Sequence, residues 1–187
     1  MTTESQTAGP TTGRTGRTRR LALMPQRVRK TVLVLHVITA VGWLGVTFAD
    51  LALGVTALTT DRPEIQHAMF QALGVIATFV LIPIAWSAFL TGLLLALGTK
   101  WGLIRHKWVL TKFLLTTVVV TLTTFSLTPG LKERRAEVEA TPADQLLLLE
   151  VDDRSGMISA GIVSTSIYVI CVLLSILKPW GRTRWGR

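Results

Sequence analysis

The sequence predicts an all-α polytopic membrane protein, a four-transmembrane-helix up-down bundle with both termini in the cytoplasm. Hydrophobic residues make up 49% of the 187 residues. They gather in four long apolar runs, and about 20 apolar residues suffice to cross the hydrocarbon core of a bilayer. Basic residues collect at the chain ends and at the middle connection, which is the charge pattern that orients membrane proteins. The runs use most of the chain, so one membrane domain is expected.

The first element is a segment rich in Thr, Gly and Arg over residues 1–20, which has almost no large apolar side chains. Such a segment cannot bury enough surface to offset its ordering entropy, so we expect a disordered basic cytoplasmic tail. The four-helix transmembrane domain is expected over residues 21–180, and a second basic cytoplasmic tail over 181–187. The expected spans are about 31–58, 70–97, 108–127 and 157–177, with an outer loop at 128–156.

Pro83 lies inside the second span and tends to kink the helix, because proline has no backbone N–H. In a membrane such a kink either opens a cavity or is simply tolerated. The sequence shows no convincing internal repeat, since the second pair of spans lacks counterparts of His36 and Asp50.

Charge is divided unequally between the two sides of the predicted bundle. The formal net charge is +9, and 15 of the 20 Lys and Arg residues fall on the side of the termini and the middle connection. Nine of the 11 acidic residues fall on the other side. The positive-inside rule therefore predicts a multi-pass protein of the plasma membrane with cytoplasmic N and C termini. Anionic inner-leaflet lipid explains the positive charge, and nucleic acid is excluded as a partner because no recognition motif accompanies that charge.

One polar stripe runs along the first span, where His36, Trp43 and Asp50 follow at intervals of seven residues. A step of seven returns to within about 20° of the same helical face. Ionisable groups at membrane depth usually face a bundle interior or a water-filled cavity. The stripe therefore predicts the inward face of the first helix.

His36 and Lys112 are expected at a similar depth, about 7–8 Å from the cytoplasmic edge at 1.5 Å per residue. Asp50 lies some 21 Å further along the helix, near the outer edge, where it marks the interface. The cytoplasmic end is thus the predicted site, and its candidate residues are His36, Trp43 and Lys112. The alternatives are a structural hydrogen bond for His36 and a snorkelling side chain for Lys112.

Two further helices carry polar stripes that either line a cavity or join helices by hydrogen bonds. Their members are Lys112, Thr116, Thr123 and Ser126 on the third span, and Ser164, Tyr168, Cys171 and Ser175 on the fourth. No metal site is expected, because His36, His67 and His106 lie at different depths. Haem held by His36 as its only protein ligand is geometrically easier than a pair of histidine ligands.

Three segments carry a resemblance: LHVITAVGWLG at Leu35–Gly45, the Pro-containing second span, and WVLTKFLLT at Trp108–Thr116. Over most of residues 31–178 the chain resembles an uncharacterised bacterial family of small four-helix integral membrane proteins. More distantly it is similar to the membrane-bound, histidine-containing protoporphyrinogen oxidases and to the copper-resistance membrane domain. The oxidase pattern is a first-helix Leu-His followed by Trp, and a third-helix Trp-x-x-x-Lys. The matching residues are Leu35, His36, Trp43, Trp108 and Lys112.

This resemblance implies haem bound near His36, with Lys112 assisting redox chemistry on a porphyrinogen or similar substrate. The sequence leaves three functions open. The first is a small haem- or quinone-linked redox protein, and the second is an ion- or proton-coupled transporter component that uses the stripe from His36 to Asp50. The third is a non-catalytic membrane assembly partner. Besides the lipid bilayer, the expected partners are a second copy of the chain or another membrane protein.

Overall fold

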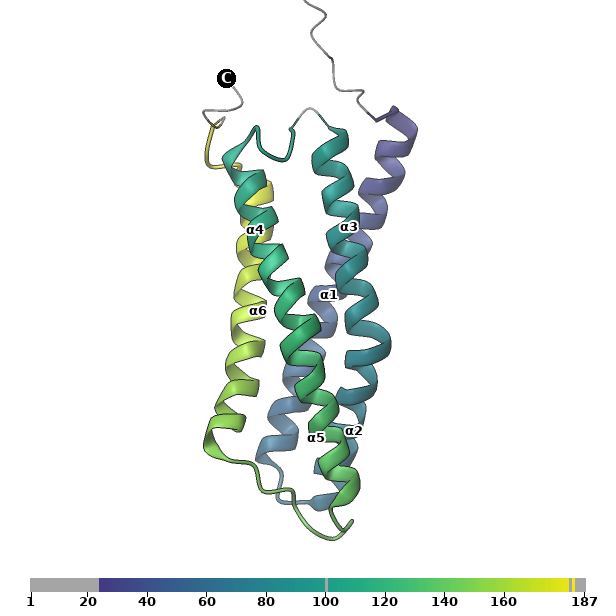
Figure 1. Cartoon of the computed structure of the whole chain (residues 1–187), viewed down its shortest axis with the longest axis vertical. Helices are drawn as coiled ribbons and strands as arrows, with labels where there is room; N and C mark the ends of the chain where they lie inside the picture. Colours follow the sequence, from purple (N-terminus) through teal and green to yellow (C-terminus); the bar gives the residue numbers. More distant parts are fainter. Residues whose placement is uncertain (1–23, 100, 182, 184–187) are drawn as a thin grey trace, which may run out of the picture.

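The computed structural model describes residues 24–99, 101–181 and 183. The tail predicted over 1–20 lies outside these residues, as does most of the tail predicted over 181–187. Within the described residues every regular element is helical, and the elements join into four long rods that run up and down beside one another (Figure 1). The prediction of an all-α fold with four long apolar helices is confirmed. Each rod is long and apolar enough to cross a membrane.

The first rod is α1 (Gln26–Thr59), and the fourth is α6 (Val151–Leu177). Each of the other two contains a short π-helical turn in its middle. The second rod comprises α2 (Pro63–Ile76), the π-helical turn η1 (Ala77–Leu81) and α3 (Ile82–Gly98). The third comprises α4 (Lys107–Leu122), the π-helical turn η2 (Thr123–Leu127) and α5 (Thr128–Ala140).

We call the two ends of the bundle the basic end and the acidic end. The basic end is where α1 and α4 begin and α3 and α6 end (Figure 1). The acidic end is where α2 and α6 begin and α1 and α5 end.

The structure corrects the bounds of the loop expected over 128–156. There α5 continues the third rod to Ala140, and α6 already begins at Val151. Only residues 141–150 form an irregular connection. The prediction failed because it ended the helix where the apolar run ends, whereas α5 is polar and charged. Ion pairs one turn apart support this polar helix, with Arg134 Nη1 2.8 Å from Glu137 and Arg135 Nε 2.8 Å from Glu139.

The core consists of two clusters stacked along the bundle. The central cluster contains Trp43, Leu81, Ala85, Ala88, Val119, Val120 and Tyr168. The acidic-end cluster contains Ala57, Leu58, Phe70, Leu73, Ala77, Leu131 and Val138. Side chains on the outside of the rods are largely apolar and exposed, as lipid contact would require.

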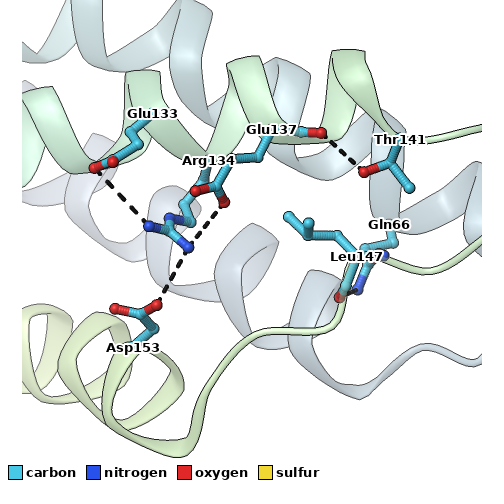
Figure 2. A network of polar contacts seen from close by, with 7 residues as sticks. All are labelled: Gln66, Glu133, Arg134, Glu137, Thr141, Leu147 and Asp153. Atoms are coloured by element: carbon cyan, nitrogen blue, oxygen red, sulfur yellow. Dashed lines mark hydrogen bonds and ion pairs between the residues drawn. The ribbon is translucent and has the colours of Figure 1, made fainter.

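Polar contacts tie the acidic end together (Figure 2). Arg134 of α5 reaches across to α6, with its Nη1 3.2 Å from Asp153 Oδ2. Gln66 of α2 accepts a hydrogen bond from the backbone N–H of Leu147 at 2.7 Å. Arg154 donates to the carbonyl oxygen of Leu58 at 2.7 Å, which closes α6 onto the end of α1. These contacts hold the 141–150 connection against the acidic-end cluster.

Candidate functional site

His36 joins α1 to α3 through the backbone of the partner helix. Its Nδ1 lies 3.0 Å from the carbonyl oxygen of Ala88 and 3.1 Å from Thr91 Oγ1. A carbonyl oxygen only accepts, so Nδ1 carries the proton in this contact. A Cβ on Gly92 would lie 2.9 Å from His36 Cε1, so the glycine makes room for the ring. The contact has the form of the interhelical hydrogen bond that the sequence left open.

Lys112 is held on a different pair of helices. Its Nζ donates to Ser175 Oγ at 2.9 Å, and that hydroxyl donates to the carbonyl oxygen of Cys171 at 2.8 Å. His36 and Lys112 are therefore bonded to different helices, His36 to α3 and Lys112 to α6.

Trp43 lies deeper, in the central cluster, and is only 2% exposed. Its ring meets that of Tyr168 edge to face, with the centroids 4.7 Å apart and the planes at 75°. This contact joins α1 to α6 near the middle of the bundle. Trp43 is therefore a core residue, and it also lines the cavity described next.

A cavity of about 50 Å³ lies between the central and acidic-end clusters. From the central cluster Trp43, Leu81 and Tyr168 line it, and from the acidic-end cluster Leu58, Leu73 and Leu131 do so. The remaining lining residues are Thr47, Asp50, Leu51, Gly54, Val55, Thr123, Leu127, Met157, Ile158, Gly161 and Ser164. Every rod contributes to its wall.

Asp50 is the one carboxylate residue among those that line this cavity. Both carboxylate oxygens are buried and make no hydrogen bond to the described residues. Asp50 lies eight residues, about 12 Å at 1.5 Å per residue, inside the level of Leu58, where Arg154 closes the acidic end. Its place near the outer edge of the bilayer stays a prediction. Within the bundle, residues of all four rods line the cavity beside it.

Four hydroxyl-bearing residues share the cavity with Asp50. The Thr47 hydroxyl donates a hydrogen bond to the carbonyl oxygen of Trp43, at 3.0 Å. Thr123 and Ser164 line the cavity, and their hydroxyls make no hydrogen bond to the described residues. Tyr168 adds a buried phenol beside Thr47. The site combines one carboxylate, several hydroxyls and apolar walls.

Two matching segments place π-helical turns at this cavity. The first segment overlaps η1 and continues to the proline after it: Thr78-Phe79-Val80-Leu81-Ile82-Pro83. The second does the same at η2: Thr124-Phe125-Ser126-Leu127-Thr128-Pro129. Both read Thr-Phe-x-Leu-x-Pro, and the leucine of each lines the cavity. Proline cannot donate to the helix ladder, and a π-helical turn accommodates the break. The repeat spans only six residues in each rod, so it does not stand out when whole helices are compared.

The cavity does not bring the predicted site residues together, because it is lined by Trp43 but by neither His36 nor Lys112. The redox role implied by the resemblance therefore stays a prediction.

Comparison of the chain with protein-family models, curated proteins and solved structures finds no match.

Proposed function

We propose that the chain is a multi-pass plasma-membrane protein with its basic end in the cytoplasm, and that it is a proton-coupled transporter component. The four apolar rods support membrane insertion. The concentration of Lys and Arg at the basic end supports the orientation through the positive-inside rule. Anionic inner-leaflet lipid then faces that end of the bundle.

The observation that carries the proposal is the Asp50 carboxylate, buried without a hydrogen bond in a cavity between all four rods. An unpaired buried carboxylate costs free energy of folding, and native proteins rarely keep one without a use. Ionisable residues inside membrane bundles commonly form proton relays and ion pathways. Asp50 is thus the group that takes up and releases the transported proton.

Packed apolar clusters lie on both sides of the cavity along the bundle, which suits a carrier rather than an open pore. The central cluster separates it from the basic end, and the acidic-end cluster separates it from the other side. Proton passage therefore requires each cluster to open in turn. The two π-helical turns lie at the level where such opening would begin.

Proton flux into proteoliposomes tests this proposal. We expect purified wild-type protein to dissipate an imposed pH gradient, measured with an entrapped pH-sensitive dye. Asp50→Asn keeps the side-chain size and removes the exchangeable proton, so it should reduce the flux to that of empty liposomes. Asp61→Asn is the matched control, because Asp61 is exposed in the connection between α1 and α2. Flux that Asp50→Asn leaves unchanged would overturn the proposal.

A further inference from the structure

The cavity that contains Asp50 is lined by more side-chain oxygens than proton transport alone requires. Five residues that line the cavity carry side-chain oxygens: Thr47, Asp50, Thr123, Ser164 and Tyr168. They come from α1, η2 and α6, so three rods converge on one space. Thr47 Oγ1 directs its proton to the Trp43 carbonyl, which leaves its lone pairs free to accept. Oxygen atoms of this kind are the ligands preferred by hard cations.

We infer that the Asp50 cavity is also a binding site for a small monovalent metal cation of the size of sodium. This inference rests on the proposed function, because the cation and the proton would compete for the same carboxylate. The Asp50 oxygens supply the negative charge, and the hydroxyl oxygens of Thr47, Thr123 and Ser164 replace water around the ion.

Charge and size select this class of ligand. The cavity holds a single carboxylate, so one positive charge neutralises it, and a buried ion is tolerated only when it is paired. Within the described residues no group of three or more His, Cys, Asp or Glu side chains could hold a metal, and thus no carboxylate-rich divalent site is present. A volume of about 50 Å³ accommodates an ion and a few waters.

Thr123 links cation binding to the shape of the bundle. It is the first residue of η2, and its side chain is only 4% exposed. Because Thr123 belongs to η2, and Pro129 follows this π-helical turn, a change in the turn would also shift the Thr123 hydroxyl. Binding of a cation between Thr123 on the third rod and Asp50 on the first would hold these rods together.

Direct binding of radioactive sodium to the detergent-purified full-length protein tests the inference. We expect saturable binding that unlabelled sodium displaces, that choline does not displace, and that falls as the pH is lowered because protons compete. Asp50→Asn should abolish binding. Ser164→Ala and Thr123→Val should each weaken it about tenfold, the effect of about 1.4 kcal/mol.

Ser166→Ala is the matched control, because Ser166 lies two residues from Ser164 but is exposed and does not line the cavity. It should bind sodium as the wild type does. Each variant is first checked for an unchanged elution profile on gel filtration, and Ser164→Ala decides the result if Thr123→Val does not fold.

The outcomes separate the two proposals. Asp50-dependent proton flux without saturable sodium binding would overturn the cation site and leave the proton-coupled function in place. Saturable sodium binding that Asp50→Asn abolishes, together with proton flux that Asp50→Asn leaves unchanged, would overturn the proton-coupled function and retain the site. Sodium binding that Asp50→Asn leaves unchanged would overturn the inference.

Discussion

At the scale of single residues, the Asp50 carboxylate is a source of instability, because both oxygens are buried and lack hydrogen bonds. A polar group buried without a partner costs about 1–3 kcal/mol in mutational data. His36 is the opposite case, since its ring is bonded to the Ala88 carbonyl on the neighbouring helix. This contrast is why the proposed function rests on Asp50, while the contact of His36 joins α1 to α3.

Replacing Asp50 by leucine should increase the stability of the protein. Asp50→Leu removes an unpaired buried polar group, so we expect the free energy of unfolding to rise by about 1–3 kcal/mol. Thermal unfolding in detergent, followed by intrinsic tryptophan fluorescence, measures the change. A lower melting temperature would mean that the carboxylate has a structural partner.

Replacing His36 by alanine should weaken the contact between α1 and α3 but preserve proton flux. The loss of an interhelical hydrogen bond inside a membrane bundle costs about 0.6–2 kcal/mol. Because His36 bonds the Ala88 carbonyl as a link between helices, we expect absorption spectra of the purified wild-type protein to show no Soret band. A Soret band that His36→Ala abolishes would support the redox function instead.

At the scale of helices, the second and third rods differ from the other two by their central π-helical turns and the prolines that follow them. The Thr-Phe-x-Leu-x-Pro segments run in antiparallel rods, yet both lie beside the cavity. The side chain of Trp86, on the second rod, donates to Thr124 Oγ1 on the third at 3.2 Å, which joins the two rods at this level. The paired turns give these rods a common place to bend.

Restoring regular helix at these turns should stabilise the bundle and impair transport. Alanine is about 3 kcal/mol more favourable than proline in a helix interior, so Pro129→Ala allows α-helical bonding to replace η2 and moves Thr123 relative to Asp50. We expect a higher melting temperature and a several-fold lower proton flux. Pro63→Ala is the matched control, since Pro63 lies in the first turn of α2, where proline is tolerated. Equal flux in both variants would show that the turns are not used in transport.

The extent to which sequence alone predicted these elements follows from the physical signals involved. Apolar length identified four helices, because a bilayer-spanning run is a strong signal. It placed the end of the third helix too early, since α5 consists largely of polar and charged residues that lie outside such a run. The Ala88 partner of His36 was also out of reach, because a backbone carbonyl has no side-chain signature. The enclosure of Asp50 depends on how far the other rods extend, which one helix cannot show.

At the scale of the whole molecule, the unequal distribution of basic residues sets the proposed orientation. The proposed orientation places the acidic end, with Arg134, Gln66 and the 141–150 connection, outside the cell. In this orientation the acidic-end cluster lies on the outer side of the Asp50 cavity, and the central cluster lies on its inner side.

Thiol labelling of intact cells tests this orientation. In a Cys171→Ser background, Pro142→Cys places a thiol on the exposed connection at the acidic end, and Ile104→Cys places one on the exposed connection at the basic end. A membrane-impermeant maleimide added outside should label only the Pro142→Cys variant. Labelling only of the Ile104→Cys variant would reverse the orientation.

The central claim is that the space beside Asp50 is reached from water although it lies inside an apolar bundle. Accessibility of neighbouring positions on α6 measures this most directly. In the Cys171→Ser background, Ser164→Cys and Ser166→Cys are treated in proteoliposomes with a small, charged, water-soluble thiol reagent. The account predicts that the Ser164→Cys variant reacts as the carrier opens, that it reacts more slowly in saturating sodium, and that the lipid-facing Ser166→Cys variant does not react. Failure of Ser164→Cys to react while the protein transports protons would contradict it.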